Sequence, residues 1–345
     1  MAWGGGRCFL MPCGASGRRM FTQSRIAALA LSTLCLAYPV ASRSQPAQTG
    51  THVAASAMPP AAAAAPASQG SEIESQPQPQ ARAYLFRGAL GPIFSRGMDK
   101  LTDRLEQAGV KASVWEFTIC RFVADQAIQA YRAEPAPIVL IGHSMGGLCA
   151  LTFAEILQEQ NIPVSLVVTV DPAHASPKVP LNVERFINIF LSTSILGGGD
   201  IVAEPGYHGH YASFDMKDHD EVTHINIDKL DYVHAQLVSM ITEIAKVPAT
   251  ADASPVPLRY VVPPDATVEL WDSGTALQTR RGETLQKLAA DNHVPMWSLT
   301  QANQLAQNAQ LAAGQRIVVP RHLQPPAPAP MAAPAASQQT AAVKR

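Results

Sequence analysis

Residues 137–158 read PIVLIGHSMGGLCALTFAEILQ, and this stretch decides the fold. Its first part, Pro137 to Ile141, is a continuous apolar run of the kind found in β-strands that are buried on both faces. Its last part, Met145 to Gln158, has the pattern of a helix. Between them, residues 142–146 form a Gly-x-Ser-x-Gly sequence at the strand-to-helix turn. Such a turn exposes the serine above the edge of the sheet, so the stretch indicates that Ser144 is a nucleophile.

The crowding of this turn explains its glycines. Side chains two residues before and after Ser144 would clash, so glycine is expected at both positions. The helix that follows points its N-terminus at the serine, and the backbone N–H of Met145 is expected to stabilise a developing oxyanion. His143 is expected to belong to the turn and not to act as a base, because adjacent side chains point apart there.

Strand and helix patterns alternate from Arg82 to Val247, on both sides of the opening stretch. This alternation predicts an α/β fold with a mostly parallel sheet and helices on both faces. Further strands are predicted at 83–86, 112–117, 164–170, 185–191 and 221–224, and further helices at 97–108, 122–131 and 229–245.

A serine nucleophile needs a carboxylate and a histidine, which follow it along the chain in that order in this kind of fold. Two aspartates are candidates for the carboxylate. Asp171 ends the 164–170 strand, and Asp200 follows the Gly197-Gly198-Gly199 run. Asp171 is favoured, because the carboxyl ends of parallel strands are where such sheets place their sites.

His224 is the predicted base. It ends the short strand predicted at 221–224, from which its side chain can reach the nucleophile. His174 is a further candidate, whereas His234 lies in the middle of a helix and is expected to be structural. The second oxyanion donor is expected in the glycine-rich loop after the 83–86 strand, from the backbone of Ala89 or Leu90.

Together these features resemble the α/β-hydrolase family in its compact, lipase- and esterase-like form, over about residues 84–244. The resemblance implies an acyl-enzyme mechanism on an ester or thioester. In it, Ser144 attacks the carbonyl, His224 takes the proton and Asp171 orients His224. Met145 and the Ala89/Leu90 backbone would hold the oxyanion. Neither a metal nor another cofactor is predicted. Loop polarity explains the polar cluster His208, His210, Asp218, His219 and Asp220 better than metal binding does.

A second folding pattern occupies residues 273–321. It predicts a strand, two short helices and a closing strand, a small α+β (βααβ) unit. Three short stretches of this unit resemble the lysin motif (LysM), namely Gly282-Glu283-Thr284-Leu285, Asn303-Gln304-Leu305 and Gly314 through Pro320. Glu283 departs from the usual aspartate of that family. The resemblance implies binding of N-acetylglucosamine polymers such as peptidoglycan, here through Gly282, Glu283, Thr284, Gln310 and Leu311.

The remaining segments indicate export. Residues 1–42 place arginines before the short apolar run 26–40 and small residues after it, the order of a cleavable signal peptide, so no stable membrane span is expected after cleavage. Residues 43–81 and 322–345 are rich in Ala, Pro and Gln and are predicted to be disordered. Residues 248–272 are predicted to be a proline-rich linker between the two domains, 82–247 and 273–321.

Composition excludes one class of partner. The net charge is −1, which supports no large-scale attraction to nucleic acid. Outside the leader only Cys120 and Cys149 remain, and two core thiols are favoured over a disulfide.

The sequence as a whole predicts a serine hydrolase that is periplasmic or cell-wall associated and tethered to peptidoglycan. The competing hypotheses are an inactive peptidoglycan-binding scaffold and an acyltransferase that uses the same three residues.

Overall fold

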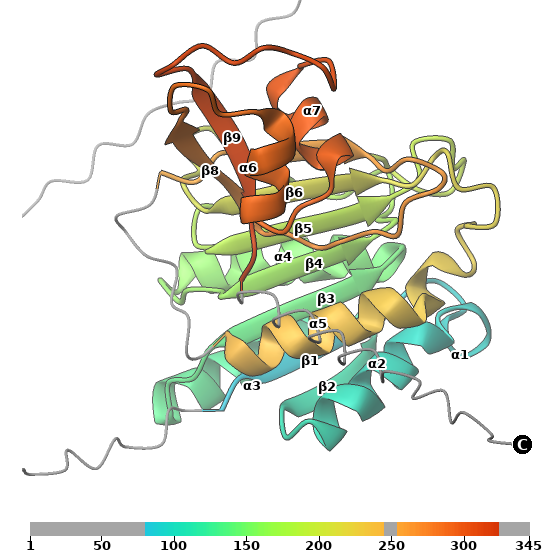
Figure 1. Ribbon diagram of the computed structural model, residues 1–345. Coiled ribbons are helices and arrows are strands. Elements are labelled where there is room, and N and C mark those ends of the chain that lie inside the picture. Colours follow the sequence, from blue (N-terminus) through green and yellow to red (C-terminus); the bar gives the residue numbers. More distant parts are fainter. Residues whose placement is uncertain (1–79, 245–253, 324–345) are drawn as a thin grey trace, which may run out of the picture. The chain divides into compact units, whose positions relative to one another are not determined.

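The computed structural model describes residues 80–244 and 254–323 (Figure 1). The predicted signal peptide (1–42) lies outside the described residues. The same holds for residues 43–79 of the predicted disordered segment, residues 245–247 at the end of the predicted first domain, residues 248–253 of the predicted linker and residues 324–345 of the predicted tail.

Two sheets organise the described residues. In the first part of the chain the elements are β1 (Arg82–Arg87), α1 (Gly91–Phe94), α2 (Arg96–Gln107), β2 (Lys111–Glu116), the 3₁₀ turn η1 (Phe117–Ile119), α3 (Cys120–Ala133), β3 (Ile138–His143), α4 (Met145–Glu159), β4 (Leu166–Val170), β5 (Arg185–Phe190), β6 (His210–Asp215), the 3₁₀ turn η2 (Ile227–Lys229), α5 (Asp231–Glu243) and β7 (Leu258–Val261). They are followed by β8 (Ser273–Gln278), α6 (Leu285–Asp291), α7 (Met296–Asn303) and β9 (Arg316–Arg321).

The larger sheet has seven strands in the order β2-β1-β3-β4-β5-β6-β7. Every neighbouring pair in it is parallel. The first strand, β1, therefore lies inside the sheet, and the chain then moves to one edge at β2, returns to β3 and continues to the other edge. This order places the carboxyl ends of β3 and β4 side by side, and both candidate groups Ser144 and Asp171 follow those ends.

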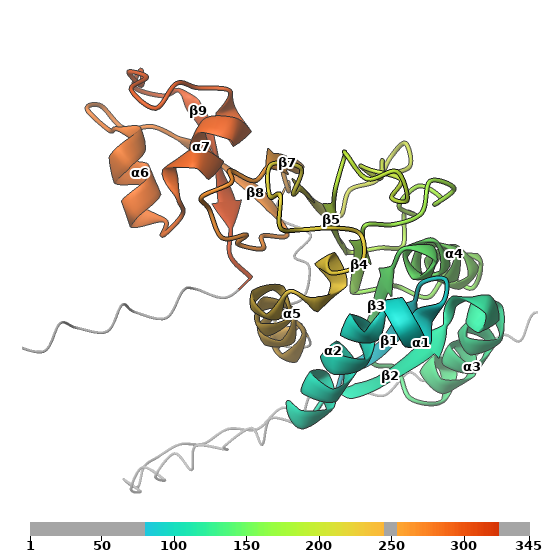
Figure 2. The same cartoon turned by 90° about the vertical axis from the view of Figure 1, so that its right-hand side faces the viewer.

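Each face of this sheet has its own apolar core. Alternate residues of the central strands point to opposite faces, as their spacing requires. One face packs against α2 and α5, and the other packs against α3 and α4. Figure 2 shows these two helix pairs on opposite sides of the strands. The predicted α/β fold, with a parallel sheet covered on both faces, is confirmed.

The smaller sheet pairs β8 with β9 in antiparallel fashion, with α6 and α7 between them along the chain. Thr284 caps α6, because its side chain accepts a hydrogen bond from the backbone of Lys287 at 3.2 Å. The order strand, helix, helix, strand is the predicted βααβ arrangement.

Aromatic packing and an ion cluster link this second unit to the larger sheet. Trp271 is fully buried and packs against Tyr260 of β7 and Trp297 of α7, with ring centroids 5.4 Å and 5.8 Å away. The Asp272 carboxylate, which is also fully buried, lies 3.4 Å from Arg185 of β5 and 2.9 Å from Arg321 of β9. Residues 271 and 272 thus belong to a shared core.

The structure differs from the predicted linker at 248–272, because residues 258–261 form β7, the seventh strand. The prolines at 255, 257, 263 and 264 flank the strand and do not interrupt it. Edge strands tolerate proline nearby. At the outer edge of β7, the side-chain amide of Gln301 takes the place of a neighbouring strand. It accepts a hydrogen bond from the Val261 N–H at 3.0 Å and donates one to the Val261 carbonyl at 2.7 Å.

The prediction of a strand at 221–224 is wrong, since these residues form turns. The strand that precedes α5 is β6, whose polar residues disguise its pattern. His210 and Ser213 are buried there because they have distant partners, Ser273 and Asp200 respectively. Within residues 80–244 and 254–323, no helix is long and apolar enough to cross a membrane.

Candidate active site

The turn between β3 and α4 holds Ser144 in an unusual backbone conformation. Its φ is 56° and its ψ is −122°. A Cβ on Gly142 would lie 2.0 Å from the carbonyl oxygen of Gly146, and one on Gly146 would lie 2.1 Å from that of Phe86. No side chain fits at either position. The glycine spacing of the motif is therefore a steric requirement of this turn.

Asp171, His224 and Ser144 form a continuous hydrogen-bonded chain. The Asp171 carboxylate lies 2.6 Å from His224 Nδ1, and His224 Nε2 lies 3.1 Å from the Ser144 hydroxyl. Because a carboxylate can only accept, Nδ1 carries the proton and Nε2 is free to accept one from the serine. This arrangement is that of a general base directed at a nucleophile.

Asp171 is held rigidly beneath His224. It follows β4, is fully buried and has a φ of 39°. Its second oxygen accepts a hydrogen bond from the Leu191 backbone at 3.2 Å. A Cβ on Gly197 would lie 2.1 Å from that oxygen, so the chain packs closely around the carboxylate.

A cavity of about 480 Å³ opens above the serine. Met145 begins α4, and its N–H has no partner within the helix because it belongs to the first turn. Ala89 and Leu90 line the cavity beside it, in the loop that leads to α1. The residues predicted to donate to the oxyanion, Met145 and Ala89 or Leu90, therefore line the same cavity. Apolar side chains form most of the remaining wall, which includes Phe94, Ala173, Leu196 and Ile225.

The alternative acid and bases lie elsewhere. Asp200 forms an ion pair with Arg259 and accepts a hydrogen bond from the Tyr211 hydroxyl at 2.8 Å. His174 is exposed and contacts the carbonyl oxygen of Ile195 at 2.9 Å. His234 is buried, and its Nε2 contacts the carbonyl oxygen of Asp228 at 2.7 Å.

Two buried residues that also line this cavity, Ser95 and His143, connect to the backbone of His224. Ser95 Oγ lies 2.7 Å from His143 Nδ1, and His143 Nε2 lies 2.9 Å from the backbone carbonyl of His224. Burial, followed by the charge of the nearby His224, lowers the pKa of His143 to about 4, so its ring is neutral at neutral pH. Sequence reasoning missed Ser95, since no local pattern marks it.

The predicted glycan-binding residues lie in two loops that a buried threonine joins. Thr279 donates its hydroxyl proton to the Ala312 carbonyl and accepts from the Gln315 N–H at 3.0 Å. The turn 280–283 is closed by Glu283, whose carboxylate accepts from the Arg280 N–H at 2.8 Å. Glu283 thus makes the local turn contact although it departs from the family's usual residue. Gly282, with φ 78°, and Thr284 in the first loop are exposed, as is Gln310 in the second, and Leu311 is half-buried.

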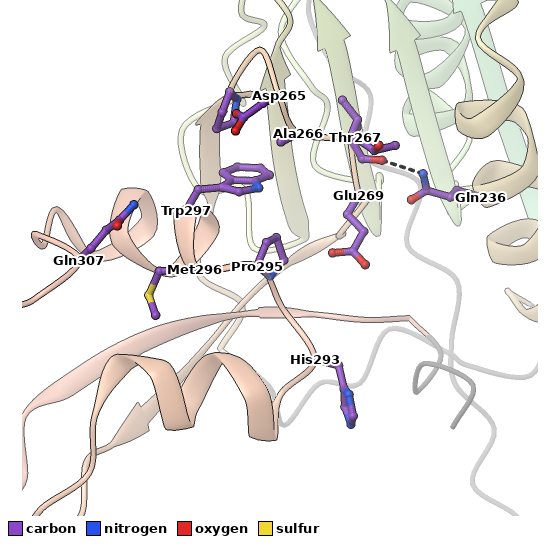
Figure 3. A pocket seen from close by; sticks show the side chains of 12 residues that line it. Gln236, Asp265, Ala266, Thr267, Glu269, His293, Pro295, Met296, Trp297 and Gln307 are labelled. Carbon is purple, nitrogen blue, oxygen red and sulfur yellow. Dashed lines mark hydrogen bonds between the residues drawn. The ribbon is translucent and has the colours of Figure 1, made fainter. Parts of the chain in front are cut away.

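A second, wider cavity of about 980 Å³ lies between residues 263–269, the start of α7 and Gln236 of α5 (Figure 3). Trp297, Met296 and Pro295 form its apolar wall, whereas Asp265 and Glu269 bring carboxylates to it. None of the predicted glycan-binding residues lines it, although Gln307, in the loop before Gln310, does.

Among the described residues, no group of three or more His, Cys, Asp or Glu side chains could hold a metal ion. Of the polar cluster noted in the sequence, His210 contacts the hydroxyl of Ser273 at 2.8 Å. His219 contacts the carboxylate of Glu221 at 3.1 Å.

Family models match segments in both parts of the chain. Residues 118–185 match the model of the thioesterase domain, and residues 278–320 match that of the LysM domain. The first match includes Ser144 and Asp171, and the second includes Gly282–Thr284. No curated protein matches the sequence.

Several solved structures resemble part of the chain. A putative hydrolase of the alpha/beta superfamily from Xanthomonas campestris is 17% identical, covers 35% of this chain and 75% of its own, and has a TM-score of 0.25. The RedJ thioesterase of prodiginine biosynthesis in Streptomyces coelicolor is 11% identical, covers 47% and 90%, and has a TM-score of 0.29. The NocB thioesterase domain of the nocardicin cluster is 14% identical, covers 45% and 90%, and has a TM-score of 0.28.

The chain thus combines an α/β-hydrolase-like body, part of which matches the thioesterase domain, with a C-terminal unit that matches the LysM domain.

Proposed function

We propose that the protein is an exported serine hydrolase that cleaves carboxylic esters or thioesters and is tethered to peptidoglycan by its LysM domain. One observation carries the hydrolase part of this proposal, namely the hydrogen-bonded chain from Asp171 through His224 to Ser144. The match of residues 118–185 to the thioesterase domain supports the same class of reaction.

The reaction begins when Ser144 Oγ attacks the carbonyl carbon of the substrate and His224 Nε2 takes the hydroxyl proton. The resulting oxyanion accepts hydrogen bonds from the Met145 N–H and from that of Ala89 or Leu90. Asp171 stabilises the positive charge that forms on His224. When the intermediate collapses, the carbonyl carbon separates from the leaving alcohol or thiol, which receives the proton from His224.

Water completes the cycle. His224 takes a proton from the water molecule as the water oxygen attacks the acyl carbon. The ester bond to Ser144 then breaks, Oγ recovers its proton from His224 and the carboxylic acid leaves. The acyl group is expected to be apolar, because the cavity wall next to Ser144 includes Leu90, Phe94 and Leu196.

This hydrolase function is tested with a fluorophosphonate probe and a panel of p-nitrophenyl esters graded by acyl chain length. We expect covalent labelling of the folded protein and a preference for apolar acyl chains over charged ones. Added alcohol distinguishes an acyltransferase, which would form a new ester at the expense of the free acid. Folded protein that takes no label and turns over no ester of the panel contradicts the proposal.

The wall-bound location rests on other observations. The LysM match covers both predicted glycan-binding loops, and the order of residues in the leader is that of an export signal. The ligand proposed for these loops is the N-acetylglucosamine polymer of peptidoglycan, held mainly by backbone groups around Gly282–Thr284 and Gln310–Leu311.

Thr279→Val is expected to weaken binding to N-acetylglucosamine oligomers by about 30-fold. Valine keeps the shape of the side chain but loses the two hydrogen bonds that hold the second loop beside the first, and each such bond contributes about 1 kcal/mol. Titration calorimetry with chitin oligomers measures the change. Thr275→Val is the matched control, since Thr275 is exposed on β8, the strand that ends just before Thr279. Equal affinities for the two variants would contradict the role assigned to these loops.

A further inference from the structure

Ser95 and His143 form a buried pair next to the proposed catalytic residues. Ser95 is 1% exposed and lies between α1 and α2, and His143 is 2% exposed and is the last residue of β3. A buried polar side chain costs free energy unless its partners are satisfied. Their burial therefore calls for a reason beyond packing.

The partners of this pair fix the position of every proton. A backbone carbonyl has no proton, so His143 Nε2 must donate to the oxygen of His224, 2.9 Å away. Nδ1 of the neutral ring is then an acceptor, and Ser95 donates its hydroxyl proton to it across 2.7 Å. The Ser95 oxygen in turn accepts from the Gly88 N–H at 3.0 Å.

The chain of hydrogen bonds therefore runs from Gly88, which precedes the proposed oxyanion donors Ala89 and Leu90, to the backbone of the proposed base. Because the Gly88 N–H already donates to Ser95, it is not available to an oxyanion. That role is left to the N–H groups of Ala89 and Leu90. The low pKa of His143 keeps the ring neutral, so the direction of the bonds is constant near neutral pH.

His224 needs such support because no strand holds it. It lies in a turn between β6 and α5, and its own carbonyl is the group that His143 holds. The two rings also pack together, with centroids 4.9 Å apart. A shift of about 1 Å in a catalytic group can lower a rate by about 10²-fold, so the backbone position of His224 matters for catalysis.

We propose that Ser95 and His143 are positioning residues, which hold the oxyanion loop and the backbone of His224 in register with each other around Ser144. This inference rests on the proposed hydrolase function and deepens it. It assigns no proton transfer to either residue.

Kinetics on the full chain with a p-nitrophenyl ester test the inference. His143→Leu removes both hydrogen bonds at similar volume and is expected to lower kcat by ~10²-fold. His143→Gln retains a donor for the His224 carbonyl and is expected to keep kcat within ~10-fold of wild type. Ser95→Ala, which deletes a single oxygen, is expected to lower kcat by ~10-fold. In all three, KM should change by less than ~3-fold, as it does when only the transition state is affected.

Thr102→Ala is the matched control. Thr102 is also a buried hydroxyl on α2, but it donates to the Met98 carbonyl within its own helix, so kcat should not change. Thermal unfolding reports whether each variant is folded, and Ser95→Ala still tests the idea if His143→Leu does not fold.

The outcomes separate the two hypotheses. An active wild type whose Ser95→Ala and folded His143 variants keep full kcat contradicts the positioning role alone. Equal losses in His143→Gln and His143→Leu also contradict it, because the carbonyl contact would then be irrelevant. A folded wild type that takes no fluorophosphonate and hydrolyses no ester contradicts the hydrolase function, and the positioning role with it.

Discussion

Ser144→Ala is expected to abolish fluorophosphonate labelling and to lower kcat for ester hydrolysis by on the order of 10⁶-fold, the scale seen when a serine nucleophile is removed. The reason is chemical, since alanine has no oxygen to form the acyl-enzyme. The His224 ring would remain in place, because its contacts with Asp171 and with the His143 ring do not involve the serine.

Ser298→Ala serves as the control for this variant. Ser298 is fully buried, and its hydroxyl donates to the Pro295 carbonyl at the start of α7, far along the chain from the turn that holds Ser144. Its hydrolysis rate should match wild type. Peptidoglycan binding by Ser144→Ala should also be unchanged. If Ser144→Ala is labelled or turns over ester as wild type does, Ser144 is not the nucleophile.

Asp171→Asn is expected to lower kcat by about 10⁴-fold at neutral pH. Asparagine removes the negative charge that stabilises the imidazolium of His224. It also presents an N–H to Nδ1, which favours the tautomer whose Nε2 carries the proton and cannot accept one from Ser144. Steady-state kinetics on the folded variant measures the loss, and circular dichroism checks the fold.

Asp200→Asn is the matched control, and it also tests the alternative acid. Asp200 contacts Arg259, Tyr211 and Ser213, and none of these residues lines the cavity above Ser144. Turnover by Asp200→Asn should remain within about threefold of wild type. If Asp200→Asn loses activity and Asp171→Asn keeps it, the acid has been assigned to the wrong residue.

Local patterns were sufficient to predict the fold and the position of Ser144. Buried parallel strands have continuous apolar sequences, and the glycines around Ser144 form a short motif that is visible in the sequence, although Gly146 also packs against the distant Phe86 carbonyl. The choice between Asp171 and Asp200 stayed open because both follow apolar stretches. Their difference depends on the order of strands in space, in which β4 lies beside β3.

Features that depend on distant partners could not be predicted. β6 contains buried polar residues that only tertiary contacts satisfy, and β7 is flanked by prolines that indicate a linker. Ser95 gave no signal, because its partner His143 lies 48 residues further along the chain. The shared core around Trp271 also changes experimental design. Removing residues 273–321 would expose that core, so point variants such as Thr279→Val test glycan binding more cleanly than truncation.

At Ser144, with its positive φ, the residue that would be best for stability differs from the residue that catalysis needs. A non-glycine residue in such a conformation costs about 1–3 kcal/mol, which the surrounding strand and helix must offset. Glycine would relieve that cost and remove the hydroxyl at the same time. Directed evolution that selects for heat resistance alone would therefore favour loss of the proposed nucleophile. Efforts to make a more robust enzyme should keep residue 144 fixed and seek their gains in surface loops far from it.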